Sequence, residues 1–246
     1  MALSWSVIVE PAGRSGAMNM AVDQALLEDA GRSGRACLRL YRWTPSCLSF
    51  GRNEPALTRY DRVEIERRGI PVVRRPTGGR AVWHDRELTY AVAAPIAAFG
   101  TLAQAYRIIH ERIAMALGSL GVVATVAPAA RPESIGAGAC FASAVGGEVV
   151  AGKRKVVGSA QVSSGPAFLQ HGSILLDGSQ ELVRSVTRGP VPGGGETTLS
   201  NLAKRAVSFD EVADAIVSSW APPPVRAPAP AVPTGRFAEP DWTWRR

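Results

Sequence analysis

A glycine-rich stretch in the first half of the chain decides the fold: Arg74-Arg75-Pro76-Thr77-Gly78-Gly79-Arg80-Ala81-Val82-Trp83-His84-Asp85. It lies between two runs with strand character, Pro71–Arg75 and Leu88–Ala93. Because Gly78 and Gly79 carry no side chains, their backbone amides can approach a ligand closely, and the flanking arginines favour an anionic or carbonyl-bearing ligand. The same residues are also typical of a tight hairpin with solvated arginines. The pattern alone leaves both interpretations open.

Working outward, the spacing of apolar residues predicts the other elements. Helical spacing is found over residues 17–30, 60–68, 102–120 and 209–220. Strand patterns are found over residues 37–43, 47–50, 71–75, 88–93 and 168–176, and a β-hairpin is predicted over 148–157. Because strands come in hairpin-like runs and helices are interspersed irregularly, we expect an α+β fold with a mixed, largely antiparallel sheet flanked by helices.

Length and composition predict one main domain. The chain has 246 residues, of which 46% are hydrophobic and 20% charged, the balance of a globular protein with a sizeable core. A Pro/Ala-rich run begins at residue 221, so we divide the chain into a domain over 1–220 and a C-terminal tail over 221–246. The apolar run Val7–Val9 is too short for a secretion signal, and no stretch reaches transmembrane length. We therefore expect a cytoplasmic protein without a membrane partner.

The net charge of +7 favours an acidic partner. Much of this charge is arginine scattered among apolar residues, without a long basic run. Such a partner could be a nucleic acid, an anionic lipid surface or an acidic protein. We interpret the charge as a generally basic surface, for which nucleic acid is the less favoured partner.

The three cysteines have no spacing typical of a disulfide framework or a zinc site, so no metal is expected. Cys37 and Cys47 lie within apolar strand patterns. Cys140 lies in the small-residue segment Gly136–Phe141, where a substrate could reach a thiol. Since a buried, inert cysteine is the common case, the pattern leaves open whether Cys140 is a nucleophile.

Lys155 and two histidines are further candidates for chemistry. Lys155 precedes two valines in a strand, where a lysine is usually exposed. If it points into a cleft, its amine could favour a nearby thiolate and exchange protons during group transfer. His84 and His171 could act as a base with Asp85 and Cys140, or be hydrogen-bonded structural residues.

His110 lies on the predicted helix over residues 102–120. We interpret it as a structural or surface residue.

The glycine-rich stretch, followed by Glu87-Leu88-Thr89-Tyr90, closely resembles the signature of the biotin/lipoate protein ligase superfamily, and specifically its octanoyltransferase branch. Other segments agree in order, and the resemblance covers the chain from about Met18 to Asp177. These segments are residues 18–23, 45–52, 140–141, 155–161 and 170–174. The resemblance implies a sheet fold similar to the catalytic domains of biotin protein ligases.

The resemblance also implies a site. The glycine loop and the strand of Lys155 would line a pocket for a lipoyl or octanoyl chain, with Lys155 at its carbonyl end. The residues that would line or shape this pocket are Arg75, Thr77, Gly78, Gly79, His84, Ser159 and Ala160.

Cys140 determines which branch the chain resembles. ATP-dependent lipoate ligases typically carry an Asn-Asp pair where this chain has Cys140-Phe141. The cysteine implies an acyltransferase that moves an octanoyl or lipoyl group from acyl carrier protein, through a thioester on Cys140, to a lysine of a lipoyl carrier protein. Acceptors of this kind are the glycine cleavage H protein and the E2 subunits of 2-oxoacid dehydrogenases. Cys140 and Lys155 would be catalytic, and no cofactor would be needed.

Three alternatives remain. An ATP-dependent lipoate or octanoate ligase would form an acyl-adenylate and require ATP and Mg²⁺. An amidotransferase would move octanoate between two lipoyl domains. A non-catalytic acyl- or nucleic-acid-binding protein would not need Cys140. The chain also departs from the family pattern at Ala142-Ser143-Ala144 and in the tail residues Asp241–Trp244.

Overall fold

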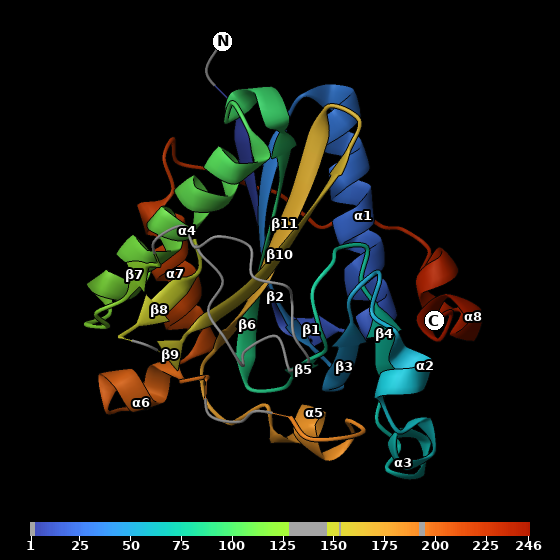
Figure 1. Ribbon diagram of the computed structural model, residues 1–246. Helices are drawn as coiled ribbons and strands as arrows, with labels where there is room; N and C mark the ends of the chain where they lie inside the picture. The colour runs from blue at the N-terminus through green and yellow to red at the C-terminus, as the bar shows by residue number, and fades with distance from the viewer. Residues whose placement is uncertain (1–2, 128–146, 153, 192–194) are drawn as a thin grey trace.

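A six-stranded sheet forms the centre of the molecule (Figure 1). The computed structural model describes residues 3–127, 147–152, 154–191 and 195–246, so Cys140 and the hairpin residue Lys153 lie outside the described residues. The order β10-β11-β6-β2 is antiparallel throughout, whereas β1 runs parallel to β2 and β12 parallel to β1. The mixed, largely antiparallel sheet confirms the predicted α+β class. Its strands are β1 (Trp5–Arg14), β2 (Ala36–Trp43), β6 (Glu87–Pro95), β10 (Val157–Ser164), β11 (Ala167–Leu175) and β12 (Val225–Arg226).

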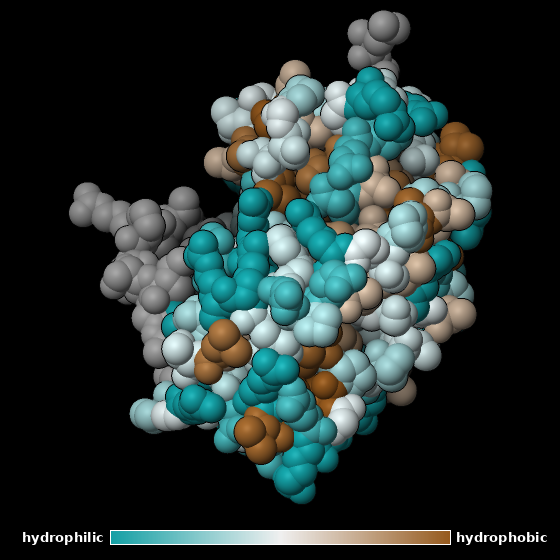
Figure 2. Space-filling view, turned by 90° about the vertical axis from the view of Figure 1, so that its right-hand side faces the viewer, coloured by the Kyte–Doolittle hydropathy of each residue, from teal (hydrophilic) through white to brown (hydrophobic). Residues whose placement is uncertain are grey.

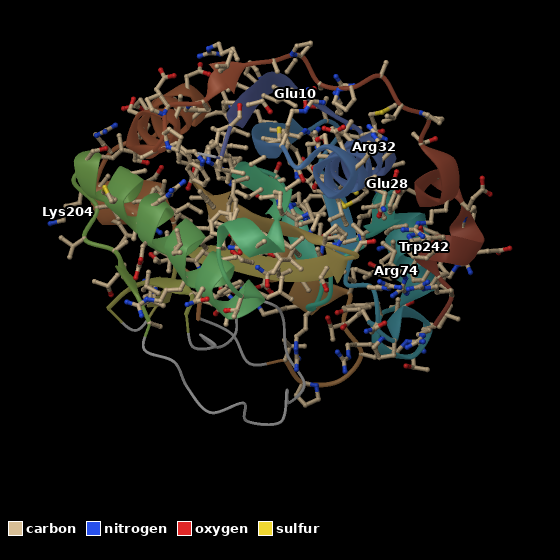
Figure 3. All side chains as sticks on the ribbon, turned by 90° about the horizontal axis from the view of Figure 1, so that it is seen from above. Glu10, Glu28, Arg32, Arg74, Lys204 and Trp242 are labelled. Atoms are coloured by element: carbon tan, nitrogen blue, oxygen red, sulfur yellow. The ribbon has the colours of Figure 1, made fainter. Side chains whose placement is uncertain are left out.

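Helices cover both faces of this sheet. Helices α4 (Leu102–Ser119) and α7 (Phe209–Ser219) pack on one face and α1 (Gly16–Ser33) on the other, as the views in Figures 1 and 3 agree. Each face of the sheet has its own hydrophobic core, because successive side chains of a strand point to opposite faces. In β6, Tyr90 packs toward α4 and Ala91 toward α1.

The helix ends follow their capping residues. Ser15 and Thr101 accept hydrogen bonds from the first turns of α1 and α4, and Ser208 forms a capping box with Glu211 in α7. Helix α1 ends at Gly34 in the left-handed conformation. The long helices predicted from the sequence are therefore confirmed.

A smaller sheet carries the glycine-rich stretch, in the order β4-β3-β5. The loop between β4 and β5 packs so closely against Gly51 that a Cβ built there would lie 2.7 Å from the carbonyl carbon of Gly79. A third sheet, in the order β7-β8-β9, contains the predicted hairpin. The elements of these regions are β3 (Cys47–Phe50), α2 (Ala56–Arg59), α3 (Arg62–Arg67), β4 (Val72–Arg74), β5 (Val82–His84), β7 (Thr125–Val126), β8 (Val149–Ala151) and β9 (Arg154–Lys155).

The C-terminal segment runs across the surface to the small sheet, along the side of α1 (Figure 1). Phe237 joins the core beneath α1, and the ring of Trp244 packs 5.2 Å from that of Phe50. The Trp242 indole donates a hydrogen bond to the Arg74 carbonyl at 3.0 Å, and Figure 3 shows these two residues side by side. The segment contains η2 (Gly235–Ala238) and α8 (Pro240–Thr243); the remaining short elements are η1 (Ile96–Ala98), α5 (Glu181–Ser185) and α6 (Leu199–Ala203).

No helix within the described part of the chain is long and apolar enough to cross a membrane.

Candidate active site

A pocket lies where the main sheet faces the small sheet. It has an aromatic wall from β2 and β5 and a wall of small residues from β10 and β11. Four of the residues expected from the sequence line it directly: Arg75, His84, Ser159 and Ala160. The other lining residues are Tyr41, Trp43, Val82, Thr89, Gly158, His171, Gly172 and Ser173. This lining of aromatic and small side chains suits an aliphatic chain. The pocket is partly open and its cavity volume is about 20 Å³, so its walls must move apart to admit such a chain.

His84 forms part of the aromatic wall. Its ring stacks on Trp43 with 3.9 Å between centroids, and its Nε2 lies 2.7 Å from the Ser49 hydroxyl. Because Arg75 donates to the same hydroxyl, Ser49 is free to donate its own proton to the imidazole. Burial lowers the pKa of His84, despite the nearby carboxylate of Glu87. His84 is therefore held neutral.

Arg75 closes the glycine loop from inside. Its guanidinium donates to the carbonyls of Gly78 at 3.1 Å and Arg80 at 2.8 Å, and to the Ser49 carbonyl at 3.0 Å. Arg75, itself part of the glycine-rich stretch, therefore holds the backbone of the loop in place. Gly78 and Gly79 are not among the residues that line the pocket, although Gly79 lies against Ala160.

A buried polar network joins Thr77 to helix α1. The Thr77 hydroxyl lies 2.6 Å from His171 Nε2, and His171 Nδ1 lies 3.0 Å from the Asp23 carboxylate. Asp23 also accepts from Tyr41 at 2.9 Å and from Arg39 at 2.7 Å. Burial would raise the pKa of Asp23, but the hydrogen bond from His171 and the charge of Arg39 hold it below its usual value. His171 therefore positions the glycine loop.

Asp85, considered with the two histidines from the sequence, lies at the surface. There it accepts a hydrogen bond from the Ser46 hydroxyl at 2.7 Å.

Lys155 is buried and ion-paired. Its amine lies 2.6 Å from a carboxylate oxygen of Glu148, and both side chains are almost completely buried, at 2% and 4% exposure. The pair sits in the third sheet, where Lys155 lies opposite Val150. The lysine thus does not occupy the solvent-facing position that is usual for this residue in a strand.

A polar cluster connects this ion pair to the pocket. His110 on α4 lies 2.8 Å from the Ser159 hydroxyl and 3.1 Å from the Tyr90 hydroxyl, which is itself 2.7 Å from Ser159. Burial lowers the pKa of His110 to about 4, and the charge of Lys155 acts in the same direction. His110 Nδ1 also lies 2.5 Å from the carbonyl of Gly147, the residue before Glu148, so the ion pair adjoins the cluster that reaches the pocket at Ser159.

The cysteines within the described residues are poor nucleophiles. Burial raises the pKa of Cys37 to about 11 and that of Cys47 to about 12. Cys140, the nucleophile predicted from the sequence, lies outside the described residues. Among the side chains that the structure describes, no group of three or more His, Cys, Asp or Glu residues is placed to hold a metal ion.

Sequence reasoning missed several residues of this site, among them Glu148, Tyr41 and Trp43. Glu148 could have been found from the hairpin register, because Val150 lies opposite Lys155 and Glu148 shares the face of Val150. Tyr41 and Trp43 look like ordinary strand aromatics in the sequence. No local pattern signals that they face a pocket, since the opposing wall comes from residues far along the chain.

The fold thus brings together a pocket between two sheets, a glycine loop held by an arginine, and a buried lysine–glutamate pair beside the polar cluster of Ser159. The chain belongs to the lipoyl protein ligase A/B catalytic domain family, whose model matches residues 15–221. This confirms the resemblance seen in the sequence.

Relatives of known name support the same branch. The chain is 36% identical to the octanoyltransferase LipM of Brevibacillus brevis over 229 residues, which cover 87% of this chain and 81% of that protein. It is 38% identical to the octanoyltransferase LipM of Exiguobacterium sibiricum, covering 89% of this chain and 87% of the relative.

Solved structures share the fold. A lipoate-protein ligase A bound with ATP superposes with a TM-score of 0.78 at 20% identity, covering 99% of both chains. Protein Ta0514 of T. acidophilum with bound lipoic acid gives 0.79 at 20% identity over the whole of both chains. At this level of identity the likeness concerns the fold alone.

Proposed function

We propose that the protein transfers an octanoyl group from acyl carrier protein, through a thioester on Cys140, to a lysine of a lipoyl carrier domain. One observation carries this proposal: the chain is similar over most of its length to octanoyltransferases. The buried Lys155–Glu148 pair, beside the polar cluster that reaches the pocket at Ser159, supports it. The acceptors would be lipoyl domain proteins such as the glycine cleavage H protein or E2 subunits.

The reaction has two balanced steps. The Cys140 thiolate attacks the carbonyl carbon of the donor thioester, a new C–S bond forms, and the carrier thiol leaves with a proton. The acceptor lysine then attacks the acyl-enzyme, a C–N bond forms, and the thiol of Cys140 is released as the amine gives up a proton. Thioester exchange keeps the acyl group activated without ATP, and amide formation makes the second step favourable.

The chain's residues have distinct roles in this proposal. The pocket walls enclose the aliphatic chain, while Lys155 favours the Cys140 thiolate and exchanges the protons of both steps. Backbone amides around the glycine loop or near Cys140 are candidates to stabilise the oxyanion. The raised pKa values of Cys37 and Cys47 make them poor candidates for the acyl-enzyme.

Intact-protein mass after mixing with octanoyl acyl carrier protein, without ATP, tests the proposal. We expect a hydroxylamine-labile octanoyl adduct on the wild type and none on Cys140→Ser. An adduct formed only from an octanoylated lipoyl domain would indicate the amidotransferase. No adduct, but AMP release from ATP and free octanoate, would indicate the ligase and overturn the proposal.

A further inference from the structure

A hollow with a partly apolar floor opens beside the C-terminal segment, away from the pocket. It is formed by α2, the start of α3 and α8. Leu57, Pro240 and Trp244 supply the apolar surface, and Arg62 and Arg245 stand at its rim. Figure 2 faces this side of the molecule and shows hydrophobic residues among hydrophilic ones in its lower half, over α2 and α3.

Two arginines beside this hollow stack on the indole ring of Trp242. The guanidinium groups of Arg236 and Arg245 lie 4.2 and 3.8 Å from the centre of the Trp242 ring. Arg245 also donates to the carbonyl of Arg52 at 2.7 Å. Within the described residues, neither Arg236, Arg245 nor Arg52 forms an ion pair with a carboxylate.

This cluster is strongly positive. Burial, and then the charges of Arg246, Arg52 and Arg236, lower the pKa of Arg245. Arg62 adds a further cation, because its pair with Glu66 is exposed and therefore weak and exchangeable.

Two acidic side chains near the hollow limit the kind of anionic partner that can bind there. Glu239 and Asp241 are exposed on the same segment, and Asp241 lines the hollow. A uniform polyanion such as a nucleic acid would meet repulsion there. An acidic protein surface of mixed character avoids it, and an apolar side chain between its carboxylates would fit the floor at Leu57 and Trp244.

Backbone contacts of Gly51 and Arg52 link the surroundings of the hollow to the glycine loop. The Arg52 amide donates to the Thr77 carbonyl at 2.7 Å, and Gly51 packs against Gly79 of the glycine loop. A partner bound at Arg245 and Arg52 would therefore lie next to the glycine loop, which adjoins the pocket.

We propose that this hollow docks an acidic surface of the carrier protein that delivers the acyl chain. An apolar side chain of that surface enters the hollow, and carboxylates beside it pair with Arg236, Arg245 and Arg62. This assignment rests on the proposed acyl transfer and adds to it the surface that recognises the donor.

The test compares two donors for the same enzyme. Transfer to a lipoyl domain is measured from octanoyl acyl carrier protein and from octanoyl-coenzyme A, which lacks the carrier protein. The variant is Arg236→Glu/Arg245→Glu, and the control is Arg107→Glu/Arg226→Glu, which changes the net charge equally at exposed arginines of α4 and β12.

For the variant we expect KM for the carrier donor to rise about tenfold or more, with kcat and the coenzyme A reaction near wild type. Added salt should raise the wild-type KM for the carrier and affect the variant less. Leu57→Asp, a single change at a residue 43% exposed, should reproduce the KM effect without altering Trp242 stacking.

A carrier KM equal to that of the control would overturn docking at this hollow. An equal loss with both donors would place the defect in the pocket and also overturn it, and a KM rise limited to the lipoyl acceptor would assign the hollow to the acceptor instead. If the wild type transfers from neither donor, the proposed function fails, which is a separate result.

Discussion

Lys155 and Glu148 form a buried ion pair, a contact whose stability depends on both partners. Two opposite charges lie 2.6 Å apart with both side chains almost fully buried. Removing one partner of such a pair leaves an uncompensated charge, which commonly costs about 3–5 kcal/mol, whereas an exposed pair contributes about 1 kcal/mol or less.

We therefore expect Glu148→Gln to lower the free energy of unfolding by about 3 kcal/mol and to slow acyl transfer, because Lys155 loses the group that positions it. Denaturant unfolding and transfer assays measure the two effects. Glu111→Gln, which breaks the exposed pair with Arg107, is the matched control. Equal losses in the two variants would contradict a special role for the buried pair.

His110 makes the stability of the protein depend on pH. Its pKa falls from 6.5 to about 4 on folding, mainly because of burial. Between these pH values His110 is protonated in the unfolded chain but not in the folded protein. The contribution of neutral His110 to the free energy of unfolding is therefore complete above pH 6.5 and is lost as the pH falls toward 4. The shift corresponds to about 3 kcal/mol.

Denaturant unfolding between pH 7 and pH 4 tests this. The His110→Gln variant, which cannot titrate there, should show a flatter loss of stability with acid than the wild type. Parallel pH profiles would mean that His110 does not contribute.

At the scale of elements, the glycine loop is held by backbone contact as well as by side chains. Gly51 at the end of β3 lies against the backbone of Gly78 and Gly79, where there is no space for a Cβ. Arg75 and His171 hold the other side of the loop.

We expect Gly51→Ala to displace the loop, with at least a tenfold loss of kcat/KM for acyl transfer and a lower melting temperature. Gly118→Ala is the control, since its site in α4 is open and alanine favours a helix. Wild-type activity in Gly51→Ala would show that the loop can move without harm.

At the scale of the whole molecule, the C-terminal segment packs as part of the domain. Phe237 is 5% exposed and belongs to the same core as residues of α1 and β2, although it lies far from them in the sequence. We propose that residues 221–246 unfold together with the rest of the chain.

Phe237→Ala should then lower the free energy of unfolding by about 3 kcal/mol in a single cooperative transition. Val225→Ala, at a position 73% exposed in the same segment, should change it by no more than about 0.5 kcal/mol. A separate early transition for the tail, or a cost for Phe237→Ala as small as that of the control, would show that the segment is only loosely attached.

Local sequence predicted the long helices, several strands and part of the site, but not the main-sheet strands β1 and β10. Apolar periodicity identified the helices that became α1, α4 and α7, because this signal depends on residues a few positions apart. The glycine-rich stretch identified Arg75 and His84, and the later motifs identified Ser159 and Ala160, all of which line the pocket.

Tertiary structure alone decided which groups meet. Glu148 reaches Lys155 through strand pairing, Asp23 reaches Thr77 through His171, and Trp242 reaches Arg74 from the end of the chain. Burial also set the protonation of His84 and His110. Such contacts depend on packing between distant segments, and the free energy of a buried charge or polar group depends on those neighbours rather than on the residues beside it in the sequence.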